Sequence, residues 1–191
     1  MAAVAAFILA AGAHGSAQTP TPGPESWRAL SYADLQRPAA ATQTYADIWK
    51  DAIEQNNRTY AERGDRRFTD SNAPVTEAHF VIWSPKKSVV LSVLDTATGC
   101  ILKEVHAAIH ATIRMCPMRL AVYQGVVVHT LDGGRSCYLE RSAALAGEAP
   151  DGDLAAAYAS YDPATRTIHT GLVIDHGPVA GCSQAIPLPP P

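Results

Sequence analysis

Three short turn motifs, each lying between runs of β-forming residues, restrict the fold of this chain more than any other feature. They are Asp95 to Gly99, Asp132 to Gly134 and Asp162 to Thr165. Aspartate, proline and glycine at such positions are typical of the turns that join neighbouring antiparallel strands. A fourth turn is expected at Pro85 to Lys87, where proline separates two further β-rich runs. The second half of the chain therefore predicts a succession of antiparallel strands.

A single amphipathic helix is predicted before the strands, from Tyr45 to Arg63. Its apolar side chains recur every three or four residues and form one stripe along the helix. The large aromatic side chains among them indicate that the stripe packs against a sheet. The apolar positions are Tyr45, Ile48, Trp49, Ala52, Ile53 and Tyr60.

Together these patterns predict an α+β fold. We expect an antiparallel β meander of about six to eight strands, with the one long N-terminal helix packed on the sheet. The 191 residues suffice for one domain of ordinary size. The composition indicates a signal peptide over residues 1–17, a proline-rich linker over 18–40, a single α+β domain over 41–186 and a proline-rich tail over 187–191.

The first 17 residues have the composition of an export signal. They contain no charged side chain, and a short apolar run leads into small residues of the kind that a signal peptidase accepts. The other interpretation is a buried N-terminal helix. The apolar run is too short to span a bilayer, which takes about 20 residues. We therefore expect an exported protein, periplasmic or secreted, without a transmembrane span.

The charge pattern narrows the range of partners. The formal net charge is -3, and lysine and arginine do not cluster. A basic surface of the kind that binds nucleic acid or an anionic membrane is therefore not expected. The sequence predicts a protein or small-molecule ligand without identifying it, and it leaves the oligomeric state open.

Four cysteines, an even number in an exported chain, predict two disulfides. The cysteines are Cys100, Cys116, Cys137 and Cys182. A bond between Cys100 and Cys116 is disfavoured, because their Cα atoms would lie about 24 Å apart along a helix and about 50 Å apart along a strand. A disulfide tolerates a Cα separation of less than about 7 Å. Such a bond would require the chain to reverse between His106 and His110, so the pairing stays open among bonds that cross the sheet.

The conformation of Glu104 to Arg119 decides whether the segment could bind a metal. On a helix, the Cβ atoms of His106 and His110 would lie about 5 to 6 Å apart. On a strand they would lie about 13 Å apart, too far to share an ion without other ligands. From Val105 to Met115 every odd position is apolar and most even positions are polar. This alternation favours one strand, which separates the two histidines.

Three functional hypotheses remain. The leading one is an exported, periplasmic, disulfide-stabilised binding or accessory domain without catalytic activity or a cofactor. The sequence has no common hydrolase, zinc-protease, phosphate-binding or dinucleotide-binding motif. The first alternative is a copper or zinc binding protein, since thioether, thiol and imidazole groups suit these ions; its ligands would be His106, His110, Met115, Cys116 and Met118. The second is a cysteine-dependent enzyme with Cys182 as nucleophile and His176 as base.

Overall fold

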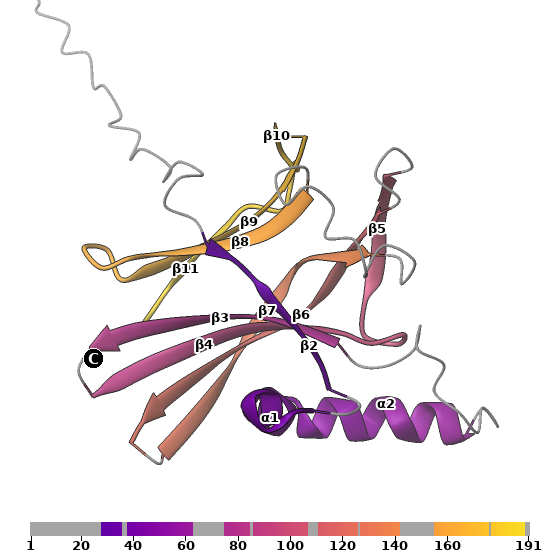
Figure 1. Cartoon of the computed structure of the whole chain (residues 1–191), viewed down its shortest axis with the longest axis horizontal. Coiled ribbons are helices and arrows are strands. Elements are labelled where there is room, and N and C mark those ends of the chain that lie inside the picture. The colour runs from indigo at the N-terminus through magenta and orange to yellow at the C-terminus, as the bar shows by residue number, and fades with distance from the viewer. Residues whose placement is uncertain are drawn as a thin grey trace, which may run out of the picture.

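The computed structural model describes residues 28–35, 38–62, 75–84, 86–106, 111–125, 127–141, 155–175 and 177–189. Antiparallel strands make up most of this part of the chain, together with two helices and a short 3-10 turn, Ala40–Thr42 (Figure 1). The helices are α1 (Gln43–Ile48) and α2 (Lys50–Glu62). The strands are β1 (Arg28–Ala29), β2 (Ser31–Asp34), β3 (Val75–Ser84), β4 (Lys87–Asp95), β5 (Ile101–His106), β6 (Ala111–Gln124), β7 (Val127–Arg141), β8 (Ala155–Asp162), β9 (Thr167–Ile174), β10 (Gly177–Pro178) and β11 (Gln184–Pro187).

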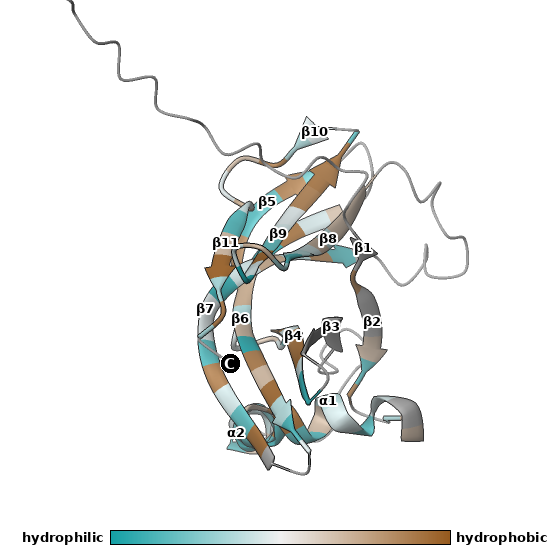
Figure 2. Ribbon diagram, turned by 90° about the vertical axis from the view of Figure 1, so that its left-hand side faces the viewer, coloured by the Kyte–Doolittle hydropathy of each residue, from teal (hydrophilic) through white to brown (hydrophobic). Residues whose placement is uncertain are grey.

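The strands form two sheets, where one meander was predicted. In the large sheet β2, β3, β4 and β6 are neighbours in that order. Strands β4 and β5 pair with successive parts of one edge of β6, and β7 pairs with β6 along its other edge. The small sheet has the order β1-β8-β9-β10, and β11 also pairs with β9. The small sheet packs on one face of the large sheet and the helices cover the other, which gives three layers (Figure 1). In Figure 2, β6 and β7 run from the level of the helices up to the small sheet.

Strand β4 is buried on both faces because it lies in the middle layer. Val89, Leu91 and Val93 point into the main core between the sheets, and each is 0% exposed. The alternate residues Val90 and Leu94 point the other way, into a second core beneath the helices. Successive side chains of a strand point to opposite faces, so a strand between two apolar layers needs apolar residues at nearly every position.

The apolar stripe of the predicted helix packs on the large sheet, but in two helices and not in one. In the described residues α1 ends at Ile48 and α2 begins at Lys50, with Trp49 between them at φ -107° and ψ 11°. Arg119 on β6 donates a hydrogen bond to the Ile48 carbonyl, with an Nη1 to oxygen distance of 2.7 Å. In a continuous helix that carbonyl would accept the N–H of Ala52. The arginine therefore takes an acceptor that the single long helix would have used.

The turn motif Asp95 to Gly99 does not form the predicted hairpin. Strands β4 and β5 both pair with β6, Val93 opposite Met118 and Ile101 opposite Met115. The residues between the strands leave the ladder as a loop, in which the Gly99 N–H donates to the Thr96 side chain at 2.9 Å. The Asp95 carboxylate binds Arg114 and not the turn backbone, and the loop connects two strands that run in the same direction.

The prediction of one strand from Glu104 to Arg119 is wrong, and so is the argument against a Cys100–Cys116 bond. Strands β5 and β6 are antiparallel partners, with His106 opposite Ala111, so the chain reverses direction between these two strands. This reversal brings Cys100 and Cys116 to a Cα separation of 4.3 Å, and they form a disulfide. The distance argument held only for an unbroken helix or strand.

Two further turn predictions have different outcomes. The Asp162 to Thr165 hairpin is confirmed, since it joins β8 and β9 and the Asp162 carboxylate accepts the Ala164 N–H at 2.8 Å. The motif Asp132 to Gly134 lies inside β7, where the register with β6 shifts, so it forms a bulge. Gly134 has a φ of 78°, a conformation that bulges and hairpin turns both use and that glycine adopts readily.

The folded region extends beyond residues 41–186 at both ends. Residues 28–34, which fall in the predicted linker, form β1 and β2 and bury Leu30 in the main core. In the predicted tail, Pro187 belongs to β11 and Leu188 is 5% exposed in the same core. Strands this short carry no periodic signal in the sequence. Residues 1–27, with the predicted signal peptide and the start of the linker, lie outside the described part.

Candidate functional site

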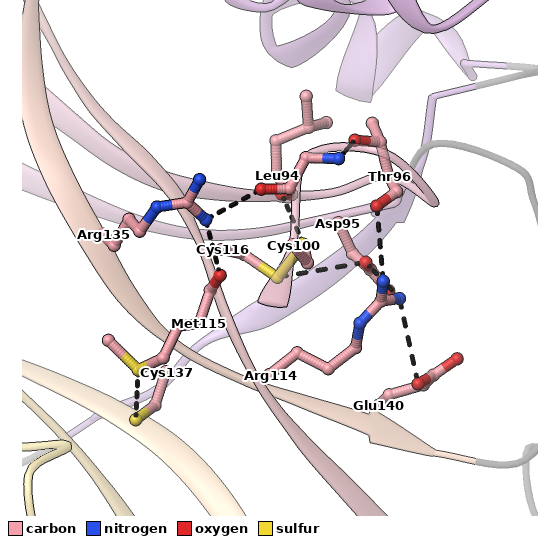
Figure 3. Close-up of a disulfide and its surroundings, with 11 residues drawn as sticks. Leu94, Asp95, Thr96, Cys100, Arg114, Met115, Cys116, Arg135, Cys137 and Glu140 are labelled. Atoms are coloured by element: carbon pink, nitrogen blue, oxygen red, sulfur yellow. Dashed lines mark hydrogen bonds and ion pairs between the residues drawn. A yellow bond between two sulfur atoms is a disulfide. The ribbon is translucent and has the colours of Figure 1, made fainter. Parts of the chain in front are cut away.

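The Cys100–Cys116 disulfide and an ion pair form a cluster where β4, β5, β6 and β7 meet. Arg114 on β6 donates to the Asp95 carboxylate at the end of β4, with an Nη1 to Oδ1 distance of 2.7 Å. The same Nη1 lies 3.9 Å from a carboxylate oxygen of Glu140 on β7. The Oδ1 atom of Asp95 also lies 3.9 Å from the Cys116 sulfur. Figure 3 shows the disulfide with this ion pair on one side and Arg135 on the other.

Burial changes the acidity of the carboxyl group in this cluster. Burial raises the pKa of Asp95 to about 6, because desolvation disfavours the charged form. The Arg114 guanidinium acts in the opposite direction, and the Glu140 carboxylate adds a further repulsion that favours the proton. A carboxyl group with such a pKa exchanges its proton near neutral pH, so it is suited to transfer a proton to a neighbouring group.

The loop that carries Cys100 is held by side chains from two other elements. Arg135 on β7 donates to the carbonyls of Gly99 and Met115, each at 2.8 Å, and thereby joins the loop to β6. The Thr98 hydroxyl donates to Asn56 on α2 at 3.3 Å. The loop therefore touches both the strand that carries Cys116 and the helical layer.

The second disulfide joins the two sheets. Cys137 on β7 is bonded to Cys182, which precedes β11. Both residues are buried in the main core, at 4% and 1% exposure, and the Cys137 sulfur contacts the Met115 sulfur at 3.4 Å. None of the four cysteines is free, as the sequence predicted. Cys182 is therefore not available as the nucleophile of a cysteine-dependent enzyme in this state, and His176 lies outside the described residues.

The candidate metal ligands do not gather at one point among the described residues. His106 ends β5 opposite Ala111, and Met118 lies seven residues further along β6, about 23 Å away at the usual rise of a strand. Met118 is also only 1% exposed in the main core, and the Cys116 sulfur is in a disulfide. His110 lies outside the described part. The three groups that do meet are Asp95, Cys100 and Cys116, whose ligand atoms lie within 4.8 Å of one another.

A second polar site lies on the helical side of the large sheet. Arg119 stacks over the Trp49 ring at 4.4 Å from its centroid and forms two hydrogen bonds to Asp51, at 2.6 and 2.7 Å. The hydrogen bond from Arg119 lowers the pKa of Asp51. Arg119 and Asp51 border an open hollow of about 370 Å³ that Ile48, Thr130 and Asp132 also line. The arginine is already paired, so the hollow presents two carboxylates and no unpaired cation for a ligand.

Strand β5 is an unusual edge strand. Among the described strands it pairs with β6 alone, and Ile101, Leu102 and Val105 are 59%, 62% and 64% exposed. The register shifts between Leu102 and Glu104, so Lys103 is an extra residue. Leu102 lies opposite Arg114 and Val105 opposite Thr112, which places both apolar side chains on one face of the sheet. The bulge thus gathers exposed apolar surface next to the disulfide cluster.

No protein-family model matches this chain, and comparisons with curated proteins and with solved structures also find no match. Among the described residues, neither helix has the length and hydropathy needed to cross a membrane.

The sequence offered little signal for these sites. Asp95 was singled out only as the opening residue of a turn, and Arg114 and Arg119 were not singled out at all. Arg119 meets Asp51 across 68 positions of sequence. A contact at such a separation leaves no spacing pattern, so only the fold reveals it.

Proposed function

We propose that this chain is an exported, disulfide-stabilised accessory domain that binds another protein chain and has no catalytic role. Export to the periplasm or the medium is supported by the composition of residues 1–17. It is also supported by two disulfides that use all four cysteines, since such bonds persist in oxidising compartments.

The observation that carries the binding proposal is edge strand β5. Natural edge strands are usually kept short, charged or covered, because an exposed apolar edge recruits another strand. Here three exposed apolar residues lie on a six-residue edge strand that is fixed at its start by the Cys100–Cys116 bond. Strand addition uses backbone hydrogen bonds for affinity and side-chain pockets for specificity. The edge therefore suits a partner that contributes an extended strand.

The residue pattern of β5 allows this strand to pair with β5 of a second copy of the chain. In an antiparallel pair centred between Lys103 and Glu104, each lysine faces the glutamate of the other copy. Leu102 then faces Val105 twice, so four apolar side chains gather on one face. Opposite charges and apolar pairs directly across a ladder stabilise the pairing. An edge of six residues buries little area, so the expected dimer is weak.

Charge reversal tests this pairing. Lys103→Glu or Glu104→Lys alone is expected to weaken the dimer at least about tenfold, because each places like charges opposite one another twice. The double variant Lys103→Glu/Glu104→Lys restores both pairs and is expected to recover the wild-type dissociation constant. Sedimentation analysis of the mature protein measures it, and Lys50→Glu on the exposed start of α2 is the matched control.

Four outcomes would speak against the proposal or a part of it. A monomer at all concentrations excludes the second copy as partner. If photocrosslinking groups at Leu102 and Val105 then give the same adducts in the cell as groups at Val128 and Leu131, the binding role of β5 fails as well. Recovery of the uncleaved chain with four free thiols in the cytoplasm would contradict export. Copper or zinc bound to the mature protein would favour the metal-binding alternative.

A further inference from the structure

We propose that Cys100–Cys116 is an exchangeable disulfide, in which an external thiolate attacks the Cys100 sulfur and Asp95 protonates the departing Cys116 sulfur. This redox role goes beyond the proposed binding function and does not depend on it. The reductant is a thiol, either a small molecule or the dithiol of another protein.

The two disulfides differ in the access that they give to an attacking group. Cys116 is 0% exposed, whereas Cys100 lies at the end of the Thr96 to Gly99 loop and is only partly buried. In the other disulfide both Cys137 and Cys182 are buried. Thiol–disulfide exchange requires the thiolate to approach one sulfur atom directly. Attack is therefore assigned to Cys100, the one cysteine of the four that is not fully buried.

The site already holds an acceptor for each thiol of the reduced state. The Cys100 sulfur lies 3.5 Å from the Leu94 carbonyl oxygen, and the Cys116 sulfur lies 3.9 Å from Asp95 Oδ1. In the disulfide these are contacts without a proton, and in the reduced form each thiol can donate to its neighbour. Arg135 keeps the loop in place, since it donates hydrogen bonds to the carbonyls of both Gly99 and Met115. Reduction thus requires no large rearrangement.

The exchange balances in atoms and electrons. The thiolate forms a mixed disulfide with Cys100, and the electron pair of the broken bond goes to the Cys116 sulfur. The neutral Asp95 carboxyl group transfers its proton to that sulfur and becomes a carboxylate paired with Arg114. A second thiolate then attacks the external sulfur of the mixed disulfide, releases the Cys100 thiolate and leaves with the first as a disulfide. The Cys100 thiolate and the Asp95 carboxylate each take up one proton from solvent, which replaces the two protons that the external thiols lost. Overall, two thiols are oxidised and Cys100–Cys116 gains two electrons and two protons.

Among the described residues, the charged groups that face Asp95 come from β6 and β7. Arg114 on β6 stabilises its carboxylate, and Glu140 on β7 favours the protonated form. With burial, these leave the pKa of Asp95 at about 6, so the carboxyl group is a proton donor in the lower part of the physiological range. The rate constant per external thiolate should therefore fall as the pH rises through 6.

The first test is reduction of the folded mature protein with dithiothreitol, followed by alkylation and peptide mapping. Cys100–Cys116 is expected to open at least about tenfold faster than Cys137–Cys182, while circular dichroism stays native. Simultaneous opening of both bonds, or faster opening of Cys137–Cys182, would overturn the proposal. The second bond serves as the internal control in the same sample.

Variants in which one cysteine of the Cys100–Cys116 pair is replaced test which sulfur atom is attacked. In Cys116→Ser the remaining Cys100 thiol is expected to form a mixed disulfide with oxidised glutathione in the native state. In the matched variant Cys100→Ser the buried Cys116 thiol should react at least about tenfold more slowly. Equal reactivity of the two thiols, in variants that keep Cys137–Cys182 and a native spectrum, would contradict the assignment.

The role of Asp95 is tested with Asp95→Asn and with the exposed Asp132→Asn as control. In wild type and in the control, the rate constant per thiolate should drop about tenfold between pH 5 and pH 8, in line with general acid catalysis. In Asp95→Asn the profile should be flat and remain at the low value. The same pH profile in wild type and Asp95→Asn would exclude Asp95 as the proton donor, whatever the effect of the substitution on stability.

Discussion

Replacing Trp49 with alanine is expected to lower the free energy of unfolding by about 3 to 5 kcal/mol, the usual cost of truncating a buried aromatic side chain. Trp49 is 1% exposed and lies in the core between the helices and the large sheet. Its indole N–H donates to the Ser92 hydroxyl at 2.9 Å, and Ser92 is itself 0% exposed. The substitution therefore leaves both a cavity and a buried hydroxyl without its donor.

The same ring also supports Arg119, which stacks on it and binds the Ile48 carbonyl between the helices. Denaturant unfolding of the oxidised protein, followed by circular dichroism, measures the effect. Trp49→Phe keeps most of the apolar area and is expected to cost about 1 to 3 kcal/mol, chiefly through the lost hydrogen bond. Tyr45→Ala, at a half-buried position of the same stripe, is the matched control and should cost less than Trp49→Ala. A loss below about 1 kcal/mol for Trp49→Ala would show that the second core is not as described.

Removing the Cys137–Cys182 bond is the other change with a large expected effect. It closes a separation of 45 residues and links the two sheets, whereas Cys100–Cys116 closes a separation of 16. Loop entropy in the unfolded chain predicts stabilisation of about 4 kcal/mol for Cys137–Cys182 and about 3 kcal/mol for Cys100–Cys116.

The double variants Cys137→Ala/Cys182→Ala and Cys100→Ala/Cys116→Ala compare the two bonds with the same chemistry. Denaturant unfolding without reductant should show the larger loss of unfolding free energy for Cys137→Ala/Cys182→Ala. The difference is increased by burial, since Cys137 and Cys182 both lie in the main core and their sulfur atoms contribute packing there. A larger loss for the Cys100/Cys116 pair would contradict the account of how the sheets are held together.

Local chemistry allowed some of this fold to be predicted from the sequence. The β8–β9 turn was found because Asp162 bonds the next backbone N–H groups wherever such a turn forms. The apolar stripe from Tyr45 onward was found because its residues pack on a single surface, with Ile48 and Trp49 at its centre. Each of these two patterns is formed by residues that lie close together in the sequence.

The errors arose where distant residues decide the local structure. Ala107 to His110 contain none of the usual turn residues, and the alternation of apolar residues continued through them. Val105, counted with the apolar face, is 64% exposed, while Ile113 is buried. At the helix break beside Trp49, the Ile48 carbonyl accepts a hydrogen bond from Arg119, 71 positions away in the chain. Gly133 and Gly134 permit a bulge as readily as a turn, and only the pairing with β6 distinguishes them.

Disulfide mapping of the protein purified without reductant tests the central claim most directly. Proteolysis without reductant and with free thiols blocked should yield two linked peptide pairs, Cys100 with Cys116 and Cys137 with Cys182, and no alkylated cysteine. That result fixes the reversal between β5 and β6 and the link between the two sheets in one measurement. A Cys100 bond to Cys137 or Cys182 would contradict the fold. Four free thiols would contradict the proposal of an exported, disulfide-stabilised domain.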